Sequence, residues 1–544
     1  SYANSETSSS SPVTGTVYGA VFYERASCQK NCEAETSEIS EKSQNNLENP
    51  WKMVEIHAEN VIFAVGGPGG LYRTSVYPKV HHGAIGVALA AGAVAQNLPE
   101  SQFGLASICF RWNVSGTYMQ CIPRFVSTAA DGVSDEKEFL EEYGQEPGEV
   151  LPLVFLKGYQ WPFDSRKTWL PTGVVGHWGS SMIDIWVYTE TVLRGRRVWL
   201  DFTRDPVGIS PEKLGGEAWN YLKNSGASEL KTPLARLEKM NPAAIEMYAD
   251  HGINIRTKKL EIAVCAQHNN GGLATDVNWE SVNLRHLFPV GEVNGSHGVY
   301  RPGGSALNSG QVGAIRAARE IALRFRSEKE TKNTKNTENL TENIPVPVEE
   351  CVENWLPDRQ ELQARMTEAG GFLRREKTVI AALADVRKQR EKYVSARMEN
   401  GTEADSGTEV RMIPSMETDR NGSLLLAEEI YLDAIRFQLE SGVGSRGSAI
   451  TLTDETDNVN YAKNIDHTKN TDHLEKVAES SPRISLNGQE VRIVPENEAF
   501  RKFVQESWFI PPTGKIGHRW VERREIPSPD SWFENVWRQS RKAD

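Results

Sequence analysis

The order of apolar and polar residues divides the chain into short strands, helical stretches and long polar inserts. Residues 13–23 alternate between apolar and polar side chains, as strands with one buried face do, and residues 53–64 have the pattern of two consecutive strands. Residues 83–95 are small and apolar, which predicts a helix packed tightly on a sheet, and the Ala-rich residues 312–325 also follow a helical pattern. The pattern thus predicts both strands and helices.

The remaining stretches differ in character. Apolar residues at helical spacing over 358–393 and 424–439 predict a small helical bundle. Residues 105–264 are rich in aromatic side chains, and the Trp- and Pro-rich residues 508–537 are expected to pack on the body or on a partner. Polar stretches that predict loops or linkers separate these parts: residues 24–50, 327–343, 400–417 and 452–482.

Composition excludes several classes of protein. A chain of 544 residues can form two or three domains, each with its own core. The formal net charge of -12, without a basic stripe, argues against nucleic acid as the main partner. No apolar run approaches eighteen residues, so we expect no membrane span and a cytoplasmic protein. Six cysteines make no disulfide framework in so long a chain. We expect no metal site, although Cys28 and Cys32 form a C-x3-C pair that leaves a metal or redox role open.

The most informative segment is residues 287–307, LFPVGEVNGSHGVYRPGGSAL. A short apolar run ends at Gly291-Glu292, and the loop after it carries His297, Arg301 and several glycines before a helical pattern begins. Glycines let backbone N–H groups approach a ligand, and a helix N-terminus favours an anionic or electron-rich group. The guanidinium of Arg301 suits a carboxylate. These features predict a ligand site.

This loop resembles the closing motif of the succinate dehydrogenase/fumarate reductase flavoprotein family, which includes L-aspartate oxidase. Residues 58–72, AENVIFAVGGPGGLY, are similar to the family's second flavin-domain strand with its ATGG turn. Residues 267–273, QHNNGGL, are similar to its H-x-x-GG turn. The likeness runs thinly over residues 17–447.

The resemblance implies an α/β fold, with a partial FAD-binding Rossmann-like domain, an inserted α+β capping domain and a C-terminal helical region. The domains expected on this basis are a FAD-binding part over 1–104, a capping domain over 105–263, a return to the FAD-binding domain over 264–326, a linker over 327–345, a helical domain over 346–450 and an extension over 451–544.

FAD is the cofactor that the resemblance implies. Glu292 matches the acidic residue that holds flavin ribityl or ribose hydroxyls, and the alternative is a solvated loop carboxylate. Gly66 and Gly67 allow close approach near the ADP half. Backbone N–H groups of the segment after Arg301 would face the flavin pyrimidine edge, although the family usually has Asn where Ser305 stands. The cofactor-binding residues expected are Gly66, Gly67, Gly291, Glu292, Gly303, Gly304, Ser305, Ala306 and Leu307.

The resemblance also implies catalytic residues. Arg301 would bind a substrate carboxylate, with a structural ion pair as the alternative. His268 and His297 would face the substrate, with a structural hydrogen bond as the alternative for each, and Tyr300 is a weaker candidate for lining the pocket.

Several family positions differ here. The family's Q-F-H-P-T is Gln-Phe-Gly-Leu-Ala over 102–106, its S-R-D has no Arg over 179–184, and its T-G-D-G is His-His-Gly-Ala over 81–84. Simple succinate or fumarate chemistry needs two clamped carboxylates and a proton donor, so another substrate is expected. Two sets of capping residues are candidates to replace these groups: Arg194, Arg196 and Arg197, or Trp161, Asp164 and Arg166.

A flavoprotein of this kind is expected to open with G-x-G-x-x-G after a strand. Residues 1–27 have no such turn, and the literal match at 442–447 follows a helical pattern, so we interpret it as a helix-ending loop. We therefore expect the first part of the dinucleotide-binding domain to be absent or on a partner chain, which would make a hetero-oligomer. The alternative function is a non-catalytic, flavoprotein-like subunit or assembly module.

Overall fold

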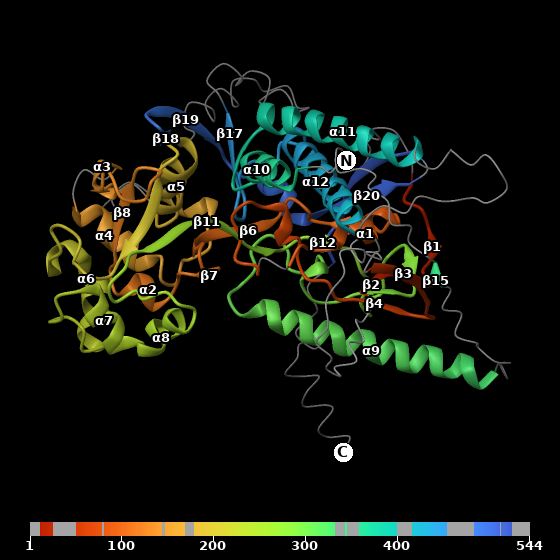
Figure 1. Ribbon diagram of the computed structural model, residues 1–544, viewed down its shortest axis with the longest axis horizontal. Coiled ribbons are helices and arrows are strands. Elements are labelled where there is room, and N and C mark those ends of the chain that lie inside the picture. Colours follow the sequence, from red (N-terminus) through yellow and green to blue (C-terminus); the bar gives the residue numbers. More distant parts are fainter. Residues whose placement is uncertain are drawn as a thin grey trace, which may run out of the picture.

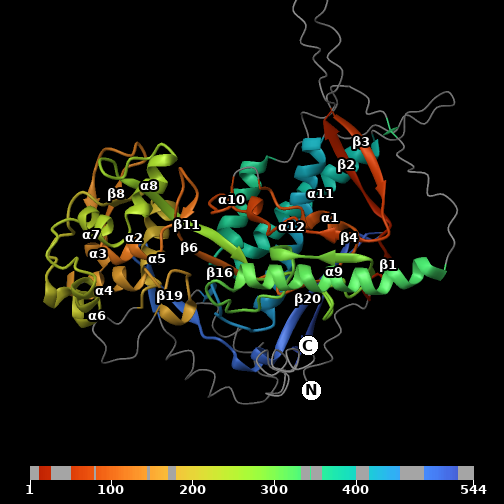
Figure 2. The ribbon, with the colours of Figure 1, turned by 90° about the horizontal axis from the view of Figure 1, so that it is seen from below.

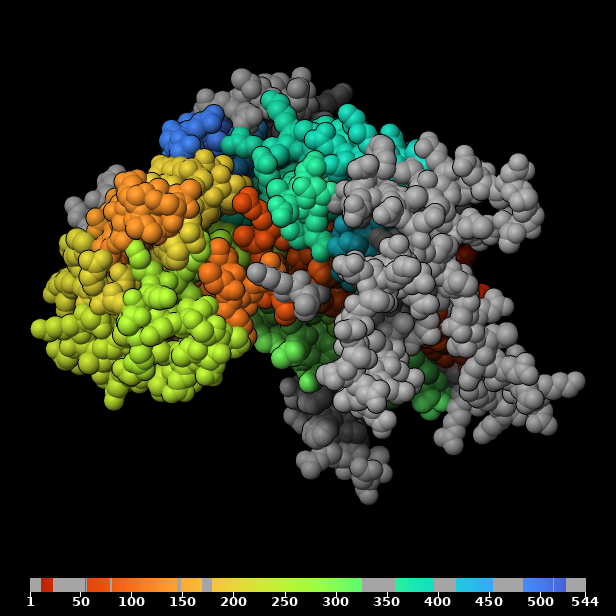
Figure 3. Space-filling model, viewed as in Figure 1, coloured from red at the N-terminus to blue at the C-terminus, as the bar shows by residue number. Residues whose placement is uncertain are grey.

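The computed structural model describes residues 11–25, 51–78, 81–143, 147–168, 179–331, 343–344, 358–399, 416–453, 483–511 and 513–524. Cys28 and Cys32 lie outside these residues, as do most of the polar stretches expected to be loops or linkers. Figure 1 shows a lobe at the left, which holds α2 to α8, beside a larger body that carries the long helix α9. The space-filling view separates the same two parts (Figure 3).

A six-stranded sheet links the lobe to the body. Its order is β7-β6-β11-β10-β8-β9, and the neighbouring strands are antiparallel. All ten residues of β11 and all seven of β6 are buried, because helices and loops cover both faces. The strands are β6 (Ser101–Ser107), β7 (Trp112–Asn113), β8 (Arg124–Thr128), β9 (Lys137–Glu138), β10 (Arg197–Asp201) and β11 (Leu260–Asn269).

Local sequence defines the starts of the lobe helices. The Ser210 hydroxyl accepts from the Lys213 N–H, and the Thr232 hydroxyl accepts from the Ala235 N–H, with proline at the next position in each case. The lobe contains α2 (Thr117–Gln120), α3 (Leu140–Tyr143), α4 (Pro147–Leu156), α5 (Met182–Tyr188), the π-helix η3 (Thr189–Leu193), α6 (Pro211–Asn224), α7 (Pro233–Met240) and α8 (Pro242–Asp250).

Short parallel pairs form the part of the body that holds the predicted site. β4 (Val61–Phe63) pairs with β14 (Leu287–Pro289), and β1 (Gly15–Thr16) pairs with β13 (Leu284–Arg285). Parallel pairing places the carboxyl ends of β4 and β14 at one edge, so the turns that follow them meet. The strands predicted over 13–23 and 53–64 are confirmed in this region, where β2 (Gly19–Arg25) pairs with β3 (Trp51–His57), and β3 with β15 (Asn343–Ile344).

The helix predicted over 312–325 lies within α9 (Ser305–Thr331). Its buried side is narrow, since Ala317 packs on Phe288 and Val290 while most of its neighbours are exposed. Figures 1 and 2 both show α9 running along one side of the body. None of the described helices has the length and apolarity that crossing a bilayer requires.

The predicted helical region is present, and two four-stranded sheets that the sequence analysis did not predict pack beside it. α10 (Arg359–Ala369), α11 (Glu376–Glu399) and α12 (Met416–Glu440) pack together with α1 (Ile85–Ala90). A four-stranded sheet of order β16-β17-β19-β18 lies beside them, formed by β16 (Leu373–Arg375), β17 (Ile450–Thr453), β18 (Arg483–Leu486) and β19 (Gln489–Val494). A second has the order β12-β5-β20-β21, formed by β5 (Ala95–Gln96), β12 (Gly272–Leu273), β20 (Phe503–Ile510) and β21 (Lys515–Glu522).

Glycines with positive φ end two of the predicted helices. The helix expected over 83–95 is shorter, because Gly92 adopts a φ of 87° after α1 and residues 95–96 then join a sheet. The interpretation of 442–447 as a helix-ending loop is confirmed. Gly442 and Gly444 both have a φ of 73°, and the Gly442 N–H bonds to the Leu439 carbonyl at the end of α12.

A buried ion pair holds the lobe together near the body. The Lys157 ammonium lies 2.7 Å from Asp184 Oδ2, and both side chains are almost fully buried. Lys157 Nζ also donates to the main-chain oxygens of Trp161, at 3.0 Å, and Gln160, at 3.3 Å. These bonds join the end of α4 to α5 and fix the segment over 160–161.

Removing one member of this pair should destabilise the lobe strongly. Asp184→Asn leaves the Lys157 charge buried without a counter-ion, which should cost about 3–5 kcal/mol in the free energy of unfolding. The double variant Lys157→Met, Asp184→Leu removes both charges and should cost less than the single change. Urea unfolding of the full chain measures both; a double variant less stable than the single one would contradict this view of the pair.

Candidate functional site

The loop after β14 leaves open space around four of its glycines. Gly291, Gly298 and Gly304 adopt φ values of 79°, 66° and 77°, and a Cβ atom built on any of them, or on Gly303, would meet nothing within 4 Å. Gly67, by contrast, is closely packed, since a Cβ atom there would lie 2.7 Å from Glu292 Oε1. The space beside the loop is therefore one that a ligand can approach, next to the first turn of α9.

Arg301 is held by an amide. Its Nε and Nη2 donate to Gln102 Oε1 at 2.9 and 2.6 Å, and Gln102 Nε2 donates back to the Arg301 carbonyl at 3.3 Å. Gln102 is 5% exposed and lies on β6. Within the described residues no carboxylate forms a salt bridge with Arg301, so a neutral partner orients a guanidinium that keeps its charge. Sequence reasoning missed this role of Gln102, whose only signal was its place in the Q-F motif.

The two histidines lie together beside this arginine. The rings of His268 and His297 are 4.6 Å apart in an edge-to-face arrangement. A register shift in β11 between Ala266 and His268 redirects the His268 side chain. Its Nδ1 is 3.0 Å from Asn270 Oδ1, and the Asn270 amide also donates to the Val299 carbonyl, which ties the turn of 267–273 to the loop.

Both imidazoles are neutral near pH 7. Burial, with the nearby charge of Arg301, lowers the pKa of His268 to about 2 and that of His297 to about 4. His268 Nε2 is buried without a hydrogen bond in the described part of the chain, and it lies 3.8 Å from Glu292 Oε1. A buried polar atom of this kind points to a missing partner.

Glu292 stands where the two parallel strands end. Its Oε1 accepts from the Asn269 N–H at 2.6 Å and from the Tyr77 hydroxyl. Burial raises the pKa of Glu292 and of Tyr77. His81 Nε2 lies 2.7 Å from the Gly67 carbonyl on the same edge. The structure therefore brings Gly66-Gly67 and Gly291-Glu292 together, and Glu292 is bonded within the protein rather than solvated. Nothing in the sequence pointed to Tyr77.

The start of α9 completes the loop. Ser305 bonds back to the Pro302 carbonyl through its N–H, at 3.3 Å, and its hydroxyl, at 2.8 Å. Ala306 lies in the same first turn, and Leu307 is 79% exposed. These three residues are at the helix N-terminus, as expected, but the Leu307 side chain faces away from the protein.

Of the two sets of candidate capping residues, the one with Asp164 and Arg166 contacts the loop after β14. The Arg166 guanidinium lies 3.8 Å from the Tyr300 ring centroid, and Asp164 binds it through two hydrogen bonds. Arg194, Arg196 and Arg197 are instead held by Glu142, Glu190, Asp135 and Glu261 within the lobe.

Gly104, which stands where the Q-F-H-P-T motif has its histidine, is closely packed. A Cβ atom on Gly104 would lie 2.8 Å from the Trp161 carbonyl, and Gly104 forms a β-bridge with Pro162. Residues 161–162 therefore pack directly on β6, which leaves no room for a larger side chain at residue 104.

Comparison with known proteins agrees with the resemblance. The chain is 41% identical over 81 residues to one subunit of the CoM/CoB fumarate reductase from Methanothermobacter marburgensis, a match that covers 15% of this chain and 14% of that protein. It is 26% identical over 254 residues to L-aspartate oxidase 2 from Ralstonia nicotianae, a match that covers 46% and 37%. The matched stretches thus cover 14% of the first relative and little more than a third of the second. No protein-family model matches.

Solved structures with similar coordinates include a quinol–fumarate reductase with menaquinol molecules, at 16% identity and a TM-score of 0.45, over 88% of this chain and 69% of that one. Another is adenylylsulfate reductase from Archaeoglobus fulgidus, at 12% identity and a TM-score of 0.43, over 87% and 70%. The two sequence relatives confirm the resemblance predicted from the motifs.

The neutral histidines predict an acid-sensitive fold. In the unfolded chain each imidazole has a pKa near 6.5, so below that pH the unfolded state binds protons that the folded state does not. Each neutral histidine therefore contributes fully to the free energy of unfolding above pH 6.5. That free energy should be lower by about 2 kcal/mol per histidine at pH 5. His268→Gln and His297→Gln should each reduce the difference in unfolding free energy between pH 7.5 and pH 5. Exposed His251, changed to Gln, is the control; an unreduced difference in both site variants would refute the argument.

Proposed function

We propose that this chain, a relative of L-aspartate oxidase and of a CoM/CoB fumarate reductase subunit, is an FAD-dependent oxidoreductase that acts on a substrate other than simple succinate or fumarate. The observation that carries the proposal is the site around Arg301, where a charged guanidinium with a neutral partner, an unbonded imidazole nitrogen and open glycines meet. Such a site is arranged to take an anionic group beside a flat ligand.

The residues present fit FAD on structural grounds. Open space surrounds Gly291, Gly303 and Gly304, so backbone can approach a ring closely, and His268 Nε2 is an unsatisfied buried atom. Glu292, Gly66 and the first turn of α9 with Ser305 and Ala306 would hold the rest of the cofactor. When bound, FAD supplies hydride transfer, and the protein has to position the substrate and exclude water.

The substrate is proposed to carry one carboxylate or similar anionic group. Arg301 would grip that group, and Gln102 would keep the guanidinium in a fixed plane without cancelling its charge. A second carboxylate lacks an equivalent clamp at Gly104, where the main chain of Trp161 takes the space. The bond that changes is a C–C, C–N or C–O bond next to an electron-withdrawing group.

The protonation states favour oxidation of a carbon atom that is bonded to nitrogen or oxygen. Both His268 and His297 are neutral near pH 7, and Asp164 raises the pKa of Arg166, so none of the three readily gives a proton to a carbon atom. Oxidation of a C–N or C–O bond needs no such donor, since the carbon would give a hydride to a bound flavin and the nitrogen or oxygen would release its proton to solvent.

A second candidate function is a non-catalytic subunit that keeps the fold for assembly. The close packing of Trp161 on Gly104 favours it, because that contact fills the place of a group used for chemistry in the family. The neutral partner of Arg301 argues for the first candidate, since a purely structural arginine in a partly buried place gains most from a carboxylate.

The proposal further includes a polypeptide segment from outside residues 1–544, on this or another chain, that supplies the dinucleotide-binding turn. Parallel strands are normally covered on both faces, yet Ile62 in β4 is 55% exposed and β4 pairs only with β14 among the described strands. On α9, Ile315 is 54% and Leu323 75% exposed. An apolar strand beside β4 and beneath α9 would cover these side chains.

The first test is a flavin assay on the complete complex. The purified protein should be yellow, and the monocarboxylate acetate should perturb the flavin absorbance by binding at Arg301. Gln102→Glu places a carboxylate against the guanidinium and should weaken acetate binding about tenfold or more, as should Arg301→Ala. Gln102→Leu removes the hydrogen bonds without adding charge and should have an intermediate effect. A colourless complex, or binding unchanged in Arg301→Ala, would favour the second candidate.

The exposed apolar side chains of Ile62, Ile315 and Leu323 give a separate prediction. Ile62→Asp and Ile315→Asp should each reduce the bound flavin per chain, because a charge on this surface opposes the covering segment. Val133→Asp, at a 78% exposed position in the capping lobe, is the matched control and should retain flavin. Mass spectrometry of the purified complex should identify the segment; equal flavin content in all three variants would count against it.

A further inference from the structure

A cavity of about 580 Å³ has neither Gln102 nor Arg301 among its lining residues. Its walls come from the turn over 72–75, β6 and the loop after it, the lobe over 188–198, β11, and the end of α10 with the residues that follow it. Phe103 lines it, while the preceding residue, Gln102, binds Arg301. Because successive side chains of a strand point to opposite faces, the two sites lie on opposite faces of β6.

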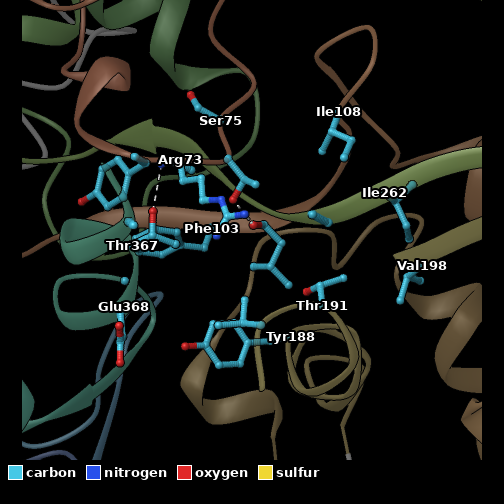
Figure 4. A pocket seen from close by; sticks show the side chains of 18 of the residues that line it. Arg73, Ser75, Phe103, Ile108, Tyr188, Thr191, Val198, Ile262, Thr367 and Glu368 are labelled. Carbon is cyan, nitrogen blue, oxygen red and sulfur yellow. Dashed lines mark hydrogen bonds between the residues drawn. The ribbon is translucent and has the colours of Figure 1, made fainter. Parts of the chain in front are cut away.

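One wall of this cavity is aromatic. Phe372 lies between Phe103, at a ring-centroid distance of 6.1 Å, and Tyr188, at 5.1 Å, and the three rings come from β6, from the residue before β16 and from α5. Figure 4 shows Phe103 and Tyr188 on neighbouring sides of the cavity. Ile262 and Val198 add aliphatic surface. The cavity can thus receive a flat apolar group of a size usual for small ligands.

Two arginines whose charges no carboxylate neutralises add positive charge to the cavity. Arg196 and Arg197 also line the cavity, but Glu190 and Glu261 neutralise them. For Arg73 and Arg111 the described residues provide no salt bridge. Arg111 donates to the Tyr77 carbonyl, at 2.9 Å.

A main-chain hydrogen bond to α10 holds Arg73 in place. Its N–H donates to Thr367 Oγ1 at 2.9 Å, which fastens the turn to α10. In Figure 4 the Arg73 side chain extends along the middle of the cavity beside Phe103 and Thr367, whereas Glu368 points away from it. A guanidinium therefore stands at the aromatic wall without a carboxylate partner in the described part of the chain.

The backbone at the capping wall is also unusual. Residues 189–193 form a π-helix directly after α5, and Thr191 and Val192 from this turn line the cavity. Val192 is 46% exposed. Single π turns within helices are rare and occur often at functional sites, because the extra residue widens the turn and redirects side chains.

We propose that this cavity is a second binding site, for a small organic anion with a flat apolar body. Arg73, supported by Arg111, binds the anionic group, and the apolar body lies against Phe103, Tyr188 and Phe372. The site is independent of the flavin, since its residues lie on the other face of β6. A ligand there contacts the turn over 72–75, the capping lobe and α10 at once, so its binding holds the lobe against the body.

The test compares a charged probe with its neutral counterpart on the full chain. Isothermal titration with 1-naphthylacetate and with 1-naphthylacetamide should show the acid binding about tenfold more tightly or better, because a charge-assisted hydrogen bond to Arg73 is lost in the amide. Arg73→Gln should remove this preference and leave the weak binding of the amide unchanged. Arg319→Gln, an exposed arginine on α9, is the matched control and should keep the preference.

A second variant tests the apolar part. Val192→Trp fills the cavity from the π-helix side and should abolish binding of both probes, with circular dichroism confirming that the variant is folded. Equal affinity for acid and amide, an acid preference retained in Arg73→Gln, or binding retained in Val192→Trp would each overturn the proposal. Absence of binding by either probe to the unchanged protein would overturn it as well.

Discussion

The pairing of β4 with β14 is the constraint on which the site depends. Val61 is paired with Leu287 and Phe63 with Pro289, although these residues are more than two hundred positions apart. Because the strands are parallel, the chain leaves both at one edge, and the turn at Gly66-Gly67 arrives beside Glu292. The fit is tight, since any side chain at residue 67 would collide with the Glu292 carboxylate. A shift of one residue in this register would exchange the partly buried Val61 and Phe63 for the exposed Ile62 and would separate the turns.

A second consequence follows from the electrostatics of that edge. Glu292 is mostly buried and takes its hydrogen bonds from Tyr77 and from the Asn269 main chain, and it is not paired with Arg301. Arg301 is oriented by the Gln102 amide instead. A direct ion pair between the two would have satisfied both groups and closed the site. Keeping them apart leaves the positive charge available to a ligand, and the desolvated imidazoles of His268 and His297 stay neutral beside it.

The sequence predicted the parts of this arrangement that depend on local pattern. The strands before the Gly66 and Gly291 turns and the helix after Arg301 follow from apolar periodicity and glycine placement, and the loop after 442 from its helix-ending glycines. Gln102 and Tyr77 could not be assigned, because each acts on a residue about two hundred positions away and only the fold brings them together. β16 and β17 were missed because, at three and four residues, they are too short to show a period of two. β20 and β21 have eight residues each, and they were not recognised as strands from the sequence.

Gly104 connects a position of the Q-F-H-P-T motif with the packing of the lobe. The family motif has a histidine at this position, and here the Trp161 carbonyl occupies the space that its Cβ would need. The main chain of Trp161 is itself fixed by Lys157, whose ammonium is anchored by Asp184 inside the lobe. Restoring a histidine at residue 104 alone would therefore collide with a segment that a buried ion pair holds in place. A larger side chain at residue 104 therefore requires the segment over 160–162 to move as well.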